Sequence, residues 1–126
     1  MNNGSESDER RKQKRLQIQN GAFAIVRPEY IKLGQIIDIG LEGLAFRYVV
    51  TGTRGNTAFE VDIFLVGDGF YLEKLPIKPI SDIKLSKKFS NGTLPMRRCG
   101  VQFGALTQNQ ITQLEYFIKN YTTGEL

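Results

Sequence analysis

Histidine is absent from this chain of 126 residues, and cysteine occurs only once, as Cys99. Without histidine, and with a single thiol, the chain lacks the ligand sets of the common metal sites and the Cys–His and Ser–His pairs of nucleophilic enzymes. The phosphate-binding loop patterns GxxxxGKS and GxGxxG are absent as well. We therefore expect no metal, no cofactor and no catalytic residues, and a protein that is not an enzyme.

Long apolar runs are also missing, so the sequence predicts no membrane span. The N-terminus opens with polar residues and then turns basic, without the apolar stretch that a signal peptide requires. The lone Cys99 cannot form an intrachain disulfide, which is typical of a reducing compartment. Together these absences favour a cytoplasmic protein.

The charge of the chain is mild overall but concentrated at one place. Seventeen basic and thirteen acidic residues give a net charge of +4. Five of the basic residues fall within the six positions from 10 to 15: Arg10, Arg11, Lys12, Lys14 and Arg15. A local basic cluster indicates an anionic partner that is bound at one site. Because residues 1–15 lack apolar periodicity, we expect a flexible basic arm there and a folded domain over residues 16–126.

The rest of the chain is dominated by short runs of alternating apolar and polar residues, which predict strands over 22–26, 35–39, 44–50, 58–66, 70–75, 82–85 and 96–103. In the clearest run, Phe59, Val61, Ile63 and Leu65 are expected on the core face, and Glu60 and Asp62 on the other face. Residues 67–69 predict a hairpin turn. Pro76 and Pro79 predict a break in the chain, and residues 86–95 predict a loop.

The period changes to that of a helix near the C-terminus. Ile111, Leu114, Phe117, Ile118 and Tyr121 recur at helical spacing, after a capping box formed by Thr107 and Gln110. Gly124 is the expected helix stop. The sequence therefore predicts a mostly β fold, with six or seven antiparallel strands that close into a barrel and one amphipathic helix that covers one end.

Two motifs point to a function. Arg11 and Arg15 form an RxxxR pattern where the arm meets the first strand, and residues 38–43 read Asp-Ile-Gly-Leu-Glu-Gly between two strands. In order and spacing they resemble the RxxxR and D/N-x-S-x-x-G motifs of the bacterial PilZ family. The resemblance extends over residues 34–46, over the strand 98–103 and over the closing helix, and so covers about residues 9–121. It implies a PilZ-like β-barrel.

The resemblance implies that the protein binds cyclic di-GMP, a second messenger with two phosphates and two guanines, as a cytoplasmic effector that signals to a partner protein. The implied ligand-binding residues are Arg11, Arg15, Asp38, Gly40 and Gly43, with Arg10 as a supporting residue. An arginine side chain can pair with phosphate or with guanine O6 and N7, and it can stack on the base. The Asp38 carboxylate suits the N–H donors of guanine, and Gly43 would permit an unusual backbone conformation and a close approach of the ligand.

The chain departs from the family motif at Gly40, where the family has a serine. The loss of one neutral hydrogen bond costs about 0.5–1.5 kcal/mol, or about two- to tenfold in affinity. Two other interpretations therefore stay open. The domain could be a degenerate PilZ domain that binds only a protein partner, or a small barrel that binds single-stranded nucleic acid. Nucleic acid ranks last, because the basic arm has no interleaved aromatic residues.

Overall fold

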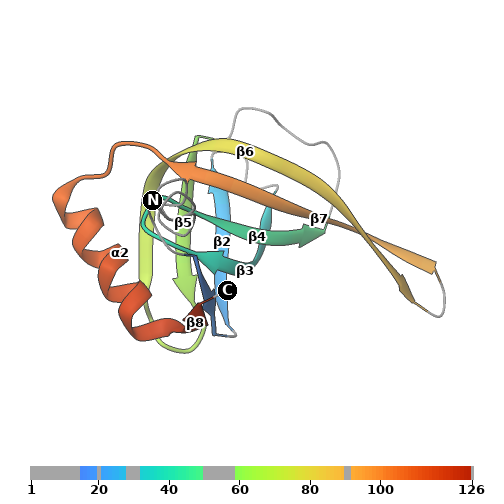
Figure 1. Ribbon diagram of the computed structural model, residues 1–126, viewed down its shortest axis with the longest axis horizontal. Helices are drawn as coiled ribbons and strands as arrows, with labels where there is room; N and C mark the ends of the chain where they lie inside the picture. Colours follow the sequence, from blue (N-terminus) through green and yellow to red (C-terminus); the bar gives the residue numbers. More distant parts are fainter. Residues whose placement is uncertain (1–14, 20, 28–31, 50–58, 90–91, 126) are drawn as a thin grey trace, which may run out of the picture.

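The computed structural model describes residues 15–19, 21–27, 32–49, 59–89 and 92–125. Six of its strands are β2 (Ala22–Arg27), β3 (Leu33–Ile39), β4 (Gly43–Val49), β5 (Glu60–Leu65), β6 (Tyr71–Phe89) and β7 (Gly92–Phe103). They are hydrogen-bonded in the order β2-β5-β6-β7-β4-β3, and a further pairing of β3 with β2 closes the antiparallel barrel (Figure 1). This confirms the predicted barrel, with the lower of the two expected strand numbers.

Two short strands, β1 (Leu16–Ile18) and β8 (Thr122–Glu125), extend the sheet beside the barrel. They exist because β3 shares one edge between two partners. Its first residues, Leu33–Gln35, pair with β2, whereas Asp38 and Ile39 pair with β1. β8 then pairs with β1. β1 therefore lies against the end of β3 that carries Asp38, the first residue of the second motif.

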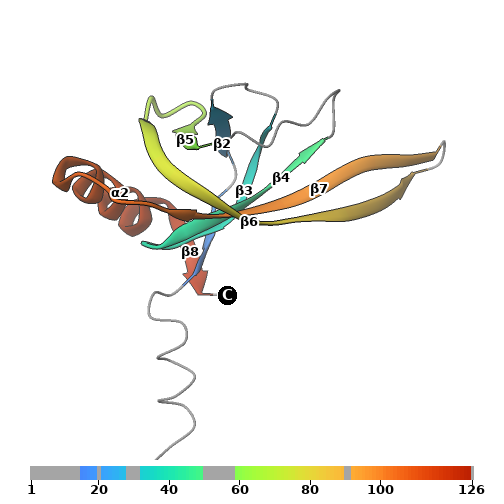
Figure 2. The same ribbon diagram turned by 90° about the horizontal axis from the view of Figure 1, so that it is seen from above.

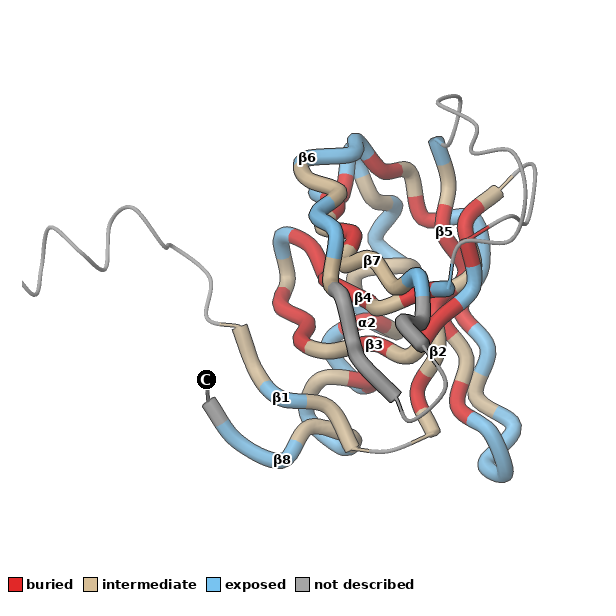
Figure 3. The backbone as a smooth tube through the Cα atoms, turned by 90° about the vertical axis from the view of Figure 1, so that its right-hand side faces the viewer, coloured by how far each residue is buried: buried red, intermediate tan, exposed pale blue. Residues whose placement is uncertain are grey.

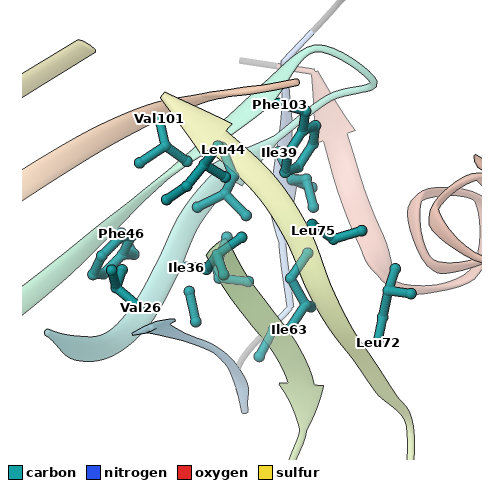
Figure 4. Packing of buried hydrophobic residues seen from close by; sticks show 14 of the residues in the cluster. Val26, Ile36, Ile39, Leu44, Phe46, Ile63, Leu72, Leu75, Val101 and Phe103 are labelled. Carbon is teal, nitrogen blue, oxygen red and sulfur yellow. The ribbon is translucent and has the colours of Figure 1, made fainter. Parts of the chain in front are cut away.

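The core fills the barrel with the inward side chains of all six strands, as Figure 4 shows for Ile36, Leu44, Phe46, Ile63 and Leu75. Each of these five side chains is at most 2% exposed. The alternation predicted for residues 44–49 is confirmed, since buried and less buried side chains alternate from Phe46 onward. Figure 3 shows the same contrast along the chain, with buried residues in the barrel strands and more exposed ones in β1 and β8. Burial of this apolar surface is the main favourable term in the folding of the barrel.

The C-terminal helix α2 (Gln108–Tyr121) begins at the predicted capping box, in which Thr107 Oγ1 accepts from Gln110 N at 3.1 Å. Leu114 and Phe117 are fully buried, and the ring of Phe117 lies 4.9 Å from that of Phe70. Gly124 lies past the end of the helix, as predicted, but in β8. The helix ends at Tyr121 because the following residues turn extended and pair with β1.

The predicted break at Pro76 and Pro79 and the predicted loop over residues 86–95 are wrong. β6 runs without interruption for 19 residues and pairs with β7 along most of its length. Pro76 is tolerated because it lies just outside the stretch that pairs with β7, whose first pair is Ile77 with Phe103. Pro79 is tolerated because, among the described residues, β6 pairs only with β7 beyond Ile77, and a β-bulge lies between Pro79 and Ser81. The two strands form a long hairpin that projects from the barrel on the side opposite α2 (Figures 1 and 2).

β5 differs from its prediction at two residues. Phe59 was expected on the core face but precedes the strand and is 54% exposed. Asp62 is fully buried. Its carboxylate accepts from Arg27 Nε at 2.8 Å, from Tyr71 Oη at 2.6 Å and from the backbone N–H of Lys74 at 2.8 Å. Lys74 has a positive φ of 62° at a bulge, so this buried carboxylate stabilises an irregular pairing of β5 with β6.

Candidate functional site

The described part of the first motif lies directly beside the second motif. Arg15 immediately precedes β1, whose antiparallel pairing with β3 places Leu16 opposite Ile39 and Gln17 opposite Asp38. Arg15 Nη1 consequently lies 2.7 Å from Asp38 Oδ1. The expected convergence of the two motifs is thus present as an ion pair between residues 23 positions apart. Arg10 and Arg11, the other predicted binding residues of the arm, lie outside the described residues.

A β-bulge in β3 determines where Asp38 lies. The register of β3 with β4 shifts between Ile36 and Asp38, and the extra residue reverses the alternation of side chains. Ile36 and Ile39 are therefore both buried in the core, whereas Asp38 lies on the outer side of the barrel opposite Ala45. Asp38 is nevertheless only 2% exposed, because side chains from two other segments cover it.

The second covering side chain is Arg98 of β7, whose Nη2 lies 3.1 Å from Asp38 Oδ2. Each carboxylate oxygen of Asp38 thus accepts from a different guanidinium, one from the chain just before β1 and one from the far side of β4. Sequence reasoning missed Arg98. A signal was present in the alternation of Cys99, Val101 and Phe103, which are all buried in the core, because it places the neighbouring Arg98 on the outer face of the same strand.

Beside this ion pair the outer surface of the barrel is hollowed into a cavity of about 280 Å³. Its walls and floor include Arg15, Arg98, Ala45, Gly100, Ser81 and Ile80. A row of small residues crosses the sheet here, with Ala45 paired to Gly100 and Gly100 to Ser81. A Cβ at position 100 would lie 2.8 Å from Ser81 Oγ, so glycine keeps this part of the surface open.

The two motif glycines have different environments. Gly40 is buried, and its N–H donates to the carbonyl of Gly43 at 2.9 Å, which closes the turn between β3 and β4. Gly43 lies in β4 against β7, where a Cβ would meet the carbonyl oxygen of Val101 at 2.2 Å. Neither residue has a positive φ. Gly43 is therefore required by the close approach of two strands, and not by the unusual backbone conformation that we expected.

A second polar cluster surrounds Asp82, on the side of β6 that faces the core. Its carboxylate accepts from Tyr48 Oη at 2.7 Å, from Arg97 Nε at 2.7 Å and from Lys32 Nζ at 3.2 Å. Burial, together with the hydrogen bond to Asp82, raises the pKa of Tyr48 to about 12. Burial alone would raise the pKa of Asp82, but hydrogen bonds from Arg97, Tyr48 and Lys32 hold it below its usual value. Asp82 is thus an ionised structural anchor between the hairpin and the core.

Solved structures with the same architecture identify the fold. The PilZ domain with c-di-GMP of YcgR from Escherichia coli superposes with a TM-score of 0.64 and 12% identity, over 89% of this chain and 91% of that one. The fold is that of a PilZ domain. MrkH, described as a c-di-GMP-dependent transcription regulatory factor, shares the PilZ fold with a TM-score of 0.60 and 13% identity, over 86% of this chain and 49% of that one.

The likeness to PilZ domains lies in the structure and in short motifs. No protein-family model matches the sequence. No curated protein matches it either. Among the described residues, no helix is long and apolar enough to cross a membrane, and no group of three or more histidine, cysteine, aspartate or glutamate side chains is placed to hold a metal ion.

Proposed function

We propose that this protein is a non-enzymatic effector module that binds cyclic di-GMP on the outer surface of its barrel and signals to a partner protein. The observation that carries the proposal is the convergence of Arg15 and Arg98 at the edge of one cavity, beside Asp38 of the second motif. The PilZ fold supports the choice of ligand, because the YcgR domain of the same fold is described with c-di-GMP.

The chemistry of the cavity suits an anionic nucleotide. A guanidinium carries a permanent charge and a planar fork of N–H donors, which match phosphate oxygens and the O6 and N7 acceptors of guanine. Ile80 is 59% exposed at the cavity and offers an apolar surface to the face of a base. Glu42 and Gln102 also line the cavity and supply acceptors for guanine N–H groups.

The size of the cavity indicates that other residues complete the site. Its volume of about 280 Å³ is just below the roughly 300–1,000 Å³ of pockets for drug-sized ligands, and cyclic di-GMP carries two guanines. Arg11, with Arg10 in support, would supply the remaining contacts from the arm. In this proposal the ligand brings the arm onto the barrel, and this ordering is the signal that a partner protein recognises.

A degenerate domain that binds only a protein partner is the alternative, and Gly40 in place of the family serine is the observation that favours it. Calorimetric titration separates the two proposals and gives the stoichiometry at the same time. We expect heat with cyclic di-GMP and none with GMP or cyclic AMP, since each of these offers only part of the ligand's surface. The absence of heat at high micromolar cyclic di-GMP would contradict the effector proposal and favour the degenerate domain.

Arg15→Ala tests the site itself. A hydrogen bond to a charged group contributes about 1.5–3 kcal/mol, so we expect about ten- to a hundredfold weaker binding of cyclic di-GMP. Thermal melting without ligand should change little, because Arg98 still neutralises Asp38. Lys119→Ala, on the last turn of α2, is the matched loss of one positive charge away from the cavity. Equal affinities of the Arg15 variant and the wild type would show that Arg15 does not contact the ligand.

A further inference from the structure

We propose that Arg98 is a further ligand-binding residue, and that Asp38 is a positioning residue that acts through Arg15 and Arg98 without touching the ligand. The proposal rests on the proposed function and deepens it. It adds a residue outside both motifs to the site, and it changes the role that the resemblance implies for Asp38.

The first step is the state of the Asp38 carboxylate. Oδ1 accepts from Arg15 at 2.7 Å and Oδ2 from Arg98 at 3.1 Å, so both oxygens already have charged donors. Asp38 is 2% exposed and is not among the described residues that line the cavity, whereas both arginines are. For a direct contact with guanine, the carboxylate would have to lose at least one of these ion pairs and become exposed to the cavity.

The second step is the donor capacity that remains. A guanidinium has five N–H donors, and Asp38 engages a single nitrogen of each arginine. The side chains of Arg15 and Arg98 are 31% and 35% exposed, so each still presents donors to the cavity. One carboxylate neutralises only one of the two cations. Arg15, Arg98 and Asp38 together carry one net positive charge. Although Glu42 also lines the cavity, the free N–H donors of the two arginines can pair with a phosphate of the ligand.

The third step is the rigidity of Arg98. It lies on β7, which is paired with β4 on one side and β6 on the other, opposite Arg47 and Ile83. Gly100 and Gln102 follow at alternate positions on the same face of the strand, and both line the cavity. The backbone of Arg98 is thus fixed by strands on both sides. Because Asp38 also holds the guanidinium in place before the ligand arrives, the entropic cost of binding is lower.

Arg98→Ala tests the binding role by calorimetry with cyclic di-GMP. We expect affinity to fall by about tenfold or more, while the apo melting temperature stays close to that of the wild type because Asp38 keeps Arg15. The matched control is Lys84→Ala, which removes one exposed positive charge from β6 on the opposite face of the hairpin and should leave affinity unchanged. If Arg98→Ala fails to fold, Arg98→Lys keeps the charge but not the fork and should still bind more weakly.

The outcomes separate this inference from the proposed function. If the wild type binds cyclic di-GMP and both Arg98 variants bind equally well, the role of Arg98 is overturned and the proposed function stands. If the wild type shows no binding at all, the proposed function fails and this inference fails with it.

Asp38→Ala, which removes both acceptor oxygens, tests the positioning role with two ligands, cyclic di-GMP and its inosine analogue, which lacks the exocyclic amino group of guanine. If Asp38 acts only through the arginines, the substitution weakens both ligands by the same factor, and their affinity ratio stays that of the wild type. If Asp38 accepts from the guanine amino group, the variant loses the preference for cyclic di-GMP, and the positioning role is overturned.

Discussion

At the scale of single residues, the glycines of the second motif serve different purposes. Gly43 has no room for a side chain, because its Cβ would lie 2.2 Å from the carbonyl oxygen of Val101. Gly40 has no positive φ, and its N–H donates to the carbonyl of Gly43. Serine is therefore compatible with the backbone at position 40, which makes the one departure from the family motif experimentally reversible.

We predict that Gly40→Ser tightens the binding of cyclic di-GMP by about two- to tenfold, because it restores one hydroxyl worth about 0.5–1.5 kcal/mol. The apo domain should gain a few tenths of a kcal/mol, since serine leaves the unfolded chain with less freedom than glycine. The measurements are a dissociation constant and a melting temperature on the same preparation. Gly40→Ala is the matched control, because it shares the backbone effect but lacks the hydroxyl. Equal affinities of the serine and alanine variants would show that the hydroxyl position does not lie at the ligand.

At the scale of elements, the β6–β7 hairpin stands apart from the barrel. β4 ends opposite Met96, so beyond this point the described residues of the two strands pair only with each other, as Ser86 does with Pro95 and Phe89 with Gly92. An isolated two-stranded ribbon contributes little stability in water. The residues of the ligand cavity lie nearer the barrel, at positions 80, 81 and 98–102. We therefore expect the outer hairpin, residues 86–95, to contribute little to the stability of the barrel and nothing to ligand binding.

Replacing residues 86–95 by Asn-Gly tests this independence. The new two-residue turn would join Leu85 to Met96, which are already opposite each other, and Asn-Gly favours the required hairpin turn. We expect the melting temperature to change by less than about 5 °C and the affinity for cyclic di-GMP to stay the same. A shortened protein that does not fold, or that loses most of its affinity, would show that the outer hairpin supports the barrel.

At the scale of the whole molecule, the cluster around Asp82 links strands that are far apart in the sequence. Lys32 comes from the start of the β3 region, Tyr48 from β4, Asp82 from β6 and Arg97 from β7. Tyr48 is 2% exposed and is hydrogen-bonded to a carboxylate, so ionisation of its hydroxyl is strongly disfavoured in the folded state. The stability of the barrel should therefore depend on pH at the alkaline end.

The direction of this dependence follows from the pKa of Tyr48, which folding raises from 10.0 to about 12. Below pH 10 the hydroxyl is protonated in both states, and its contribution to stability is complete. As the pH rises from 10 towards 12, only the unfolded chain loses this proton, so the contribution is lost. A shift of this size corresponds to about 2–3 kcal/mol in the free energy of unfolding.

Urea unfolding of the wild type and Tyr48→Phe over this pH range measures the effect. The wild type should be more stable than Tyr48→Phe below pH 10, by about 1 kcal/mol for the hydrogen bond. This advantage should disappear and then reverse as the pH approaches 12, because the loss of about 2–3 kcal/mol exceeds it. Tyr71→Phe is the matched control. Tyr71 also has a pKa raised by its hydrogen bond to a carboxylate, that of Asp62, but its ring is exposed, whereas that of Tyr48 is buried. A difference between wild type and Tyr48→Phe that is constant with pH would contradict the assigned pKa.

Much of the molecule could be predicted from the sequence, because the signals are local. The alternation in β4 from Phe46 onward, the hairpin turn at residues 67–69 and the capping box of α2 each depend on neighbours within a few positions, and the structure confirms them. The spacing of the two motifs indicated that they act together, and the ion pair of Arg15 with Asp38 is consistent with this.

Other features depend on contacts between distant segments and could only come from the tertiary structure. β6 continues through Pro76 and Pro79 because its pairing with β5, which reaches Pro76, is followed directly by its pairing with β7 from Ile77 onward. Residues 122–125 form a strand because β1 offers them an edge. Arg98 reaches Asp38, 60 residues away, because a bulge in β3 turns Asp38 outward and β4 separates the two strands by one strand width. The sequence alone determined most of the barrel strands and which residue types meet an anion. Strand pairing and register decided the remaining strands and which residues share one surface, since such contacts leave no periodic pattern along the chain.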